Sequence, residues 1–513
     1  METPTELAAL PDDALAHVFR SLPARSLADA RSVCKAWRAI VDARGLLLRR
    51  RELLPHFVHG VFINCIDHSR PHLFSRRRFP ASSSASYEID GMLDFLPTYH
   101  GDWWSVLDHC RGLVLCDIQR GGQLCVCNPA MHTWTLVPPR WQVWARWRYY
   151  AGAYLIFDPA MSVHYEVVLI PIDPERSQPE PPRPQKARSE WPVFEVRFHG
   201  VDDAPFCLDD WLQLSSDLSD EEEPPSVDED MQELNHVDDP CQVEWPPTPW
   251  TLDVFSSRVG RWEERAFVRQ GDPVGTVQDM QLDQPKPTWR GPRQRYAAYW
   301  RGGLYVHCRG SFIVRFSLRN DTYQVIKTPR DIKENTHAKP YLGISEKGVY
   351  FGTVHLCHLQ IWILSESSGQ MEWIFKYEDD LTYYGHHVRQ YVPEMGAPWI
   401  VHDTGNVSEG IRESLEWDSD SDDDTFTIKA GSTDEECYGG FDIVGFHPYK
   451  EIVFLADYFT VVAYHLKTST VQYLGNSRPE SYYRNYTNDI SESFVYTPCM
   501  IGELKKGSTM KEN

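Results

Sequence analysis

The stretch LPDDALAHVFRSLPARSLADARSVCKAWRAI, residues 10–40, decides how the chain is organised. Pro11 suits the first position of a helix, and Asp12 and Asp13 favour the positive end of the helix dipole. The apolar residues that follow at the i, i+3, i+4 and i+7 spacing of one helical face are Leu15, Val18, Phe19 and Leu22. We therefore expect an amphipathic helix that ends before Pro23.

A second helix is predicted directly after the first. Ser26 is a capping residue, with Asp29 three residues on in an approximate capping box. One face of this helix is lined by Leu27, Ala30, Cys34 and Trp37. Because a segment of fewer than roughly 40 residues rarely buries enough apolar surface to fold alone, these helices must pack on the rest of the chain or on another protein.

The order Leu-Pro-Asp-x-x-Leu-x-x-x-Phe, a second Leu-Pro and Val-Cys-Lys-x-Trp resembles an F-box over residues 7–50. The resemblance implies a three-helix module that docks on the Skp-type subunit of cullin–RING ubiquitin ligases. Ala14, Ala28 and Ala30 depart from it, since the family more often has larger apolar residues there. The residues it assigns to Skp-subunit binding are Leu10, Pro11, Leu15, Val18, Phe19, Leu22, Pro23, Leu27, Val33, Cys34 and Trp37.

The acidic charge of the chain is concentrated in two windows. Of a net charge of −22, residues 201–240 hold 15 acidic residues and no Lys or Arg, and residues 405–437 hold 11 against two basic residues. The remainder is close to neutral. Together with the Pro-rich residues 172–190, these windows predict disordered inserts, because such runs cannot bury enough apolar surface to fold. Phosphorylation by an acid-directed kinase is a second interpretation of Ser219, Ser419 and Ser421, each of which has acidic residues on its C-terminal side.

From residue 100 the pattern becomes one of short strands bounded by Gly, Pro, Asn and Asp. In a recurring unit, an apolar strand runs into a polar turn and an aromatic residue opens the next strand. These aromatic residues, which we expect to pack between units, are Trp134, Tyr165, Trp262, Tyr323, Trp373 and Tyr473. Units of about four strands, roughly 40–50 residues apart except where an insert lies between two of them, predict an α plus all-β chain with a six- or seven-bladed β-propeller.

Several turn motifs also look like the F-box-associated β-propeller domains of plant F-box proteins. They are Asn128-Pro129…Trp134, Phe157-Asp158-Pro159…Tyr165 and Gly445-Phe446-His447-Pro448. The predicted domain order is an F-box at 7–50, a connector at 55–99 that could supply closing strands, the propeller at 100–480 and a C-terminal tail at 481–513.

Residues 140–150, RWQVWARWRYY, interleave Trp with Arg, a pairing typical of recognition surfaces. Three Trp at this spacing share a face only in a helical or tight-turn segment. One interpretation is a client-binding surface made by Trp141, Trp144, Arg146 and Trp147, and the other is a buried connector between blades.

No catalytic motif is recognisable, and we expect neither a cofactor nor a metal site. Cys125 and Cys127 face one side of a strand, but no second Cys or His pair follows at the spacing of a zinc site. The sequence has no apolar run of roughly 20 residues and no secretory signal. We therefore expect a cytoplasmic or nuclear chain with no membrane or nucleic-acid partner.

The function that these patterns favour is a non-enzymatic substrate adaptor of a ubiquitin ligase. The helical segment would bind the Skp-type subunit and through it a cullin–RING ligase, and the propeller would present an unknown client protein. Two alternatives stay open. One is a propeller scaffold whose F-box-like helices pack internally, and the other is a propeller that binds a small ligand in its channel.

Overall fold

The structure is a computed structural model of the whole chain. The chain divides into two units, residues 1–173 with 240–513 and residues 174–239. All residues described below belong to the first unit. With short gaps inside some ranges, they are 11–22, 27–46, 57–76, 89–97, 104–140, 150–171, 244–276, 296–329, 339–402, 427–431, 440–499 and 504.

The described helices are α1 (Asp12–Ser21), α3 (Lys35–Ala43) and α6 (Thr382–Tyr391). Pro11 is the N-cap of α1, whereas we predicted it to be the first helical residue. Asp12 and Asp13 lie in the first turn of the helix. Leu27, Ala30 and Val33, between α1 and α3, also have helical backbone. None of the helices among the described residues has the length and apolarity that a bilayer crossing requires.

The rest of the described chain is mostly β-strand. Its first strands are β1 (Gly60–Cys65), β2 (His72–Arg76), β3 (Ser105–Cys110), β4 (Leu113–Asp117), β5 (Leu124–Asn128), β6 (Thr133–Leu136), β7 (Tyr150–Phe157), β8 (Tyr165–Pro171), β9 (Glu244–Trp245), β10 (Trp250–Ser256), β11 (Arg261–Gln270) and β12 (Gly275–Thr276). The next strands are β13 (Ala297–Trp300), β14 (Gly303–His307), β15 (Phe312–Ser317), β16 (Thr322–Lys327), β17 (Lys339–Ser345), β18 (Gly348–His355), β19 (His358–Ser367) and β20 (Gln370–Asp380). The last strands are β21 (Trp399–Val401), β22 (Thr427–Lys429), β23 (Phe441–Phe446), β24 (Ile452–Asp457), β25 (Thr460–His465), β26 (Thr470–Asn476) and β27 (Ile490–Tyr496).

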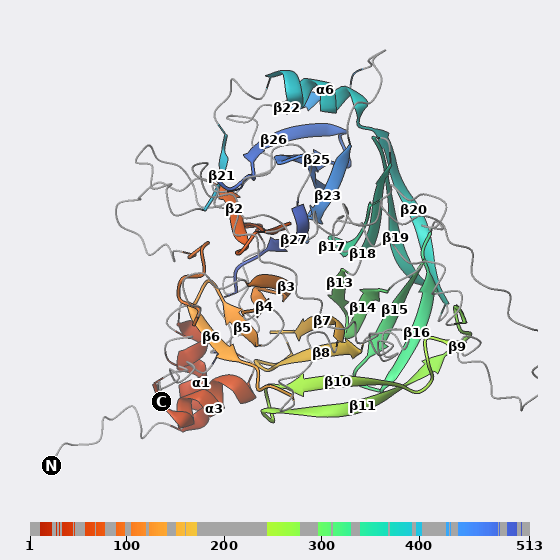
Figure 1. Cartoon of the computed structure of the whole chain (residues 1–513). Coiled ribbons are helices and arrows are strands. Elements are labelled where there is room, and N and C mark those ends of the chain that lie inside the picture. Colours follow the sequence, from red (N-terminus) through yellow and green to blue (C-terminus); the bar gives the residue numbers. More distant parts are fainter. Residues whose placement is uncertain are drawn as a thin grey trace, which may run out of the picture. The chain divides into compact units, whose positions relative to one another are not determined.

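Groups of four antiparallel strands recur along the chain (Figure 1). Two sheets follow chain order, β3-β4-β5-β6 and β17-β18-β19-β20, and a third, β23 to β26, gains β22 beside β26. The groups β7-β8-β10-β11 and β13-β14-β15-β16 join into one eight-stranded sheet, because β11 and β16 pair in parallel at their outer edges. This repetition is the pattern that the spacing of apolar strands and turns predicts.

Strands from the two ends of the chain share one sheet, in the order β21-β2-β1-β27. In its register Phe62 of β1 lies opposite Phe494 of β27. One strand from each sheet or four-strand group contacts the next in a closed series, from β3 to β7, β13, β17, β23, β27 and back to β3. The body is therefore β-rich and propeller-like, and its closure depends on β1 and β27.

Three sequence predictions need correction. Residues 481–513 are not only a tail, because β27 lies there and pairs with β1 at the edge of a sheet. The insert that contains residues 172–190 and 201–240 does not separate two units, because β8 before it and β10 after it pair in one sheet. Residues 405–437 include β22, which pairs with β26 through Ile428 and Val471. Local composition marked these segments as polar, but strand pairing depends on partners far away in sequence.

The aromatic residues that open strands lie in the packing between sheets, as predicted. Tyr165, Tyr323 and Tyr473 are buried. The indole of Trp262 on β11 donates a hydrogen bond to the carbonyl of Pro138, which follows β6, at 2.7 Å. These side chains thus stabilise the sheets and their connections.

Candidate functional site

The predicted docking helices divide into buried and exposed apolar residues. Leu15, Phe19 and Leu27 are inside the chain's own core, with exposed fractions of 4%, 1% and 0%. The Phe19 ring meets the Trp37 ring edge-on, with centroids 5.1 Å apart. These three side chains are already covered by other residues of this chain. The prediction was instead that they contact a Skp-type subunit directly.

Other predicted docking residues are available at the surface. Val18 is 39% exposed and Val33 is 65% exposed. Cys34 is exposed as well, while Leu22 and Trp37 are half-buried. Single exposed apolar residues are common on proteins, but here they lie inside the segment that the sequence pattern singles out for docking. We call Val18, Val33 and Cys34 the exposed helical residues, since Leu22 and Trp37 also pack against the buried cluster.

The helices α1 and α3 are held together by an ion pair and by apolar packing. Arg44, just after α3, forms an ion pair with Asp13 in the first turn of α1. Ile40 and Val41 of α3 are buried. Neither residue was predicted to be buried, although they follow Trp37 at the i+3 and i+4 positions of a helical face. Of the remaining predicted residues, Pro11 is the exposed N-cap, and Leu10 and Pro23 lie outside the described residues.

The buried helical residues share a hydrophobic cluster with the propeller-like body formed by strands β1 to β27, which we call the β-body. Leu15, Phe19 and Leu27 belong to one group of buried side chains with Leu113 of β4 and Val126 of β5. The sequence pattern left open whether these helices pack on the rest of the chain or on another protein. An amphipathic pattern marks which residues avoid water, but it does not say whether the covering surface belongs to the same chain.

The predicted client-binding residues Trp141, Trp144, Arg146 and Trp147 lie outside the described residues, so that interpretation stays a prediction. The segment's first residue, Arg140, is described. Its guanidinium forms ion pairs with Asp253 of β10 and Glu264 of β11. The start of the Trp-rich segment is therefore attached to the edge of the β7-β8-β10-β11 group.

The remaining predicted sites are of two kinds. Ser219, Ser419 and Ser421 lie outside the described residues. Cys125 and Cys127 are completely buried on β5, and burial raises the pKa of both thiols well above its usual range. Among the residues that the structure describes, no group of three or more His, Cys, Asp or Glu side chains is arranged to hold a metal ion.

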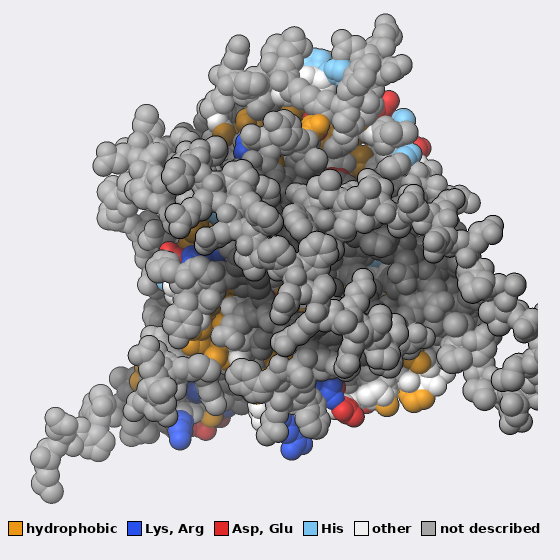
Figure 2. Space-filling view, viewed as in Figure 1, with side chains coloured by type: hydrophobic (Ala, Val, Ile, Leu, Met, Phe, Trp, Pro, Cys, Tyr) orange, Lys and Arg blue, Asp and Glu red, His pale blue; other side chains and the backbone are white. Residues whose placement is uncertain are grey.

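Among the described side chains visible in Figure 2, charged residues do not gather into one patch. The visible described Lys and Arg side chains lie in small groups, with Asp and Glu nearby. This agrees with the near-neutral charge of the chain outside its two acidic windows.

Comparison with known protein families identifies the N-terminal segment. Residues 7–53 form an F-box-like domain. The exposed helical residues and the buried cluster of α1 and α3 thus belong to this F-box-like domain. No curated protein matches the chain.

Among solved structures, the chain is similar to AztD of Citrobacter koseri. The two share 8% sequence identity over 74% of this chain and 73% of that one, with a TM-score of 0.25.

Proposed function

We propose that this chain is a substrate-recognition adaptor of a Skp–cullin–F-box ubiquitin ligase. The F-box-like domain at residues 7–53 carries the proposal. In this role the F-box-like domain docks on the Skp-type subunit and the β-body, with six or seven propeller blades, presents a client protein. The chain itself is non-catalytic: ubiquitin transfer occurs elsewhere in the complex, and the adaptor contributes by holding the client close.

The burial pattern assigns two roles within the F-box-like domain. Leu15, Phe19 and Leu27 stabilise the helices from inside. The exposed helical residues provide the apolar contact with the Skp-type subunit. Among them, Val18 is 39% exposed and Val33 is 65% exposed. A buried aliphatic side chain contributes roughly 1.5–3 kcal/mol when it leaves water, so a few such contacts support specific docking.

The test is binding of the purified full-length chain to a purified Skp-type subunit, measured by surface plasmon resonance. Val33→Glu should weaken binding by about tenfold or more, because burying an unpaired carboxylate in an apolar interface is costly. The matched control is Val259→Glu, since Val259 is 56% exposed in the turn between β10 and β11, in the β-body. Equal binding by both variants and the unmodified chain would contradict the proposal.

The burial of Leu15, Phe19 and Leu27 also favours a second candidate, a propeller scaffold that does not engage the ligase. In that case the F-box-like domain serves to stabilise the β-body. Co-purification from native cells separates the two functions: a stoichiometric Skp-type subunit supports the adaptor, and its absence supports the scaffold.

A further inference from the structure

A cavity of about 440 Å³ lies where the first strands of several sheets meet. Its lining comes from β3, β13, β17 and β27, together with residues at the end of β23. This volume is in the range of pockets that hold small ligands or single side chains. Phe446 and Pro448 of the Gly445-Phe446-His447-Pro448 motif belong to the lining, but the rest of the wall is assembled from strands far apart in the sequence.

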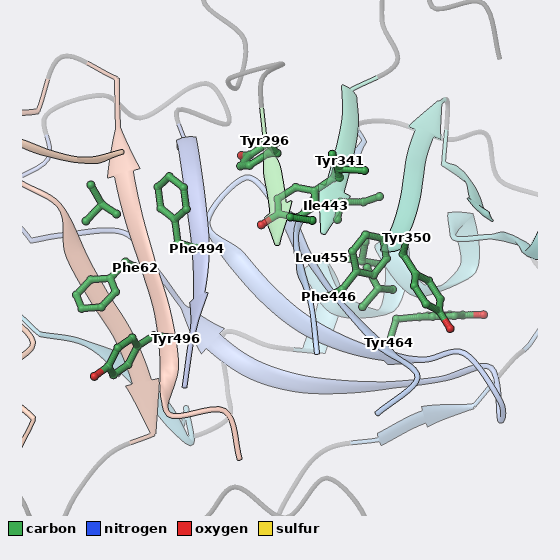
Figure 3. Close-up of a cluster of buried hydrophobic side chains, with 14 of the residues drawn as sticks. Phe62, Tyr296, Tyr341, Tyr350, Ile443, Phe446, Leu455, Tyr464, Phe494 and Tyr496 are labelled. Carbon is green, nitrogen blue, oxygen red and sulfur yellow. The ribbon is translucent and has the colours of Figure 1, made fainter. Parts of the chain in front are cut away.

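Aromatic rings form a continuous part of the cavity wall. The Tyr296 and Tyr341 ring centroids are 4.1 Å apart, and Tyr341 meets Phe446 edge-on at 5.8 Å. Tyr296 in turn meets Phe494 at 6.3 Å. Figure 3 shows the four residues: Tyr341, Phe446 and Phe494 lie on β17, β23 and β27, and Tyr296 directly precedes β13. Aromatic faces carry partial negative charge, so a wall of this kind attracts cations as well as apolar groups.

The charged groups of the lining are mostly acidic. Asp108 of β3 is 5% exposed and accepts a hydrogen bond from the Leu155 backbone N–H at 2.8 Å. Glu346, which follows β17, is exposed. The lining includes one guanidinium, Arg111, and it is already paired with the Asp158 carboxylate at 2.7 Å. The cavity therefore favours a cation over an anion.

One buried acceptor in the lining has no partner among the described residues. It is Nδ1 of His109 on β3, whose ring packs edge-on against Phe494 with centroids 5.8 Å apart. Burial lowers the pKa of His109 to about 4, although a hydrogen bond to the backbone of Val495 acts in the opposite direction. The imidazole is thus neutral at pH 7, and Nδ1 can accept a hydrogen bond from a ligand.

We propose that this cavity binds a protonated amine or guanidinium carried on an apolar body. The apolar body would pack on the wall formed by Tyr296, Tyr341, Phe446 and Phe494. The cationic group would donate hydrogen bonds to the Asp108 carboxylate and to Nδ1 of His109. Such a group has two sources, the basic side chain of a client protein and a free small amine. The proposal does not rest on ligase engagement, since the cavity lies in the β-body and can be tested without a Skp-type subunit.

The test is isothermal titration calorimetry on the full-length chain at pH 7.5. The small-molecule arm compares 2-phenylethylamine with its neutral analogue 2-phenylethanol. The side-chain arm compares Nα-acetyl-arginine amide with the neutral Nα-acetyl-citrulline amide. In at least one arm the cation should bind about tenfold more tightly than its neutral analogue, and the arm that shows this preference identifies the source.

Two variants show whether the cation binds at this cavity. Asp108→Asn keeps an acceptor for the Leu155 N–H but removes the charge, so it should weaken cation binding about tenfold and leave the neutral analogue unaffected. The matched control is Glu372→Gln, because Glu372 is exposed on β20, outside the cavity lining, and its loss should change nothing.

Should Asp108→Asn not fold, Phe494→Leu removes one ring of the wall and should also weaken cation binding, with folding followed by circular dichroism. Equal affinity for the charged and neutral compounds would overturn the proposal. So would absence of binding in both arms, or unchanged cation affinity in every folded cavity variant.

Discussion

The buried imidazole of His109 should make the stability of the chain depend on pH. In the folded chain its pKa is about 4, chiefly because burial disfavours the charged form, whereas an unfolded histidine titrates near 6.5. Above pH 6.5 both states are neutral and His109 contributes no pH dependence. As the pH falls below 6.5, the unfolded chain gains a proton that the folded chain does not, so the free energy of unfolding decreases.

The size of this effect follows from the two pKa values. Between pH 7.5 and pH 5.0, His109 alone should lower the free energy of unfolding by about 2 kcal/mol. The variant His109→Gln isolates this contribution, because glutamine does not titrate and its amide can still donate a hydrogen bond to the Val495 backbone.

The assay is equilibrium urea unfolding at pH 7.5, 6.5 and 5.0, followed by tryptophan fluorescence. The unmodified chain should lose about 2 kcal/mol more than His109→Gln across this range. Other histidines and carboxylates titrate in both proteins and cancel in the difference. If both proteins lose the same free energy between pH 7.5 and 5.0, the argument that His109 is neutral and buried is refuted.

Two further predictions concern the β-body. The Tyr323 hydroxyl has one proton, which it shares between the Pro246 and Pro247 carbonyl oxygens at 3.1 and 2.8 Å. Tyr323→Phe removes this shared hydrogen bond and should lower the free energy of unfolding by about 1–2 kcal/mol in urea denaturation. No change would contradict the role of this bond. Replacement of residues 174–239 by a Gly-Ser linker should leave the melting temperature unchanged in scanning calorimetry, because β8 and β10 on either side pair with each other. A large fall in the melting temperature would show that this unit supports the fold.

The F-box-like domain shows how far a local pattern reaches. The apolar spacing of Leu15, Val18, Phe19 and Leu22 predicted an amphipathic helix, and α1 spans Asp12–Ser21. The same spacing also predicted that the four side chains form one docking face. In the structure Leu15 and Phe19 are buried while Val18 is exposed. Helical periodicity ranks residues by apolar character, and only tertiary packing decides which of them the chain covers itself.

The β-body shows the same division on a larger scale. Apolar runs and turn residues predicted repeated short strands, because turn conformation depends on a few neighbouring residues. They did not predict that β27 lies within 481–513 and pairs with β1, more than 400 residues earlier in the chain. Nor did they predict that residues 172–190 and 201–240 interrupt a sheet between β8 and β10. Pairing between distant strands leaves little trace in either strand's own composition.

The sequence alone determined that the chain carries an F-box-like segment before a β-rich body of repeated four-strand units, because helical spacing and turn chemistry are local properties. The tertiary structure decided how the body closes, which residues of the helical face stay exposed, and that Asp108 and His109 share a cavity with Tyr341 and Phe494. These outcomes depend on contacts between segments hundreds of residues apart, whose free energies exist only once the strands are packed together.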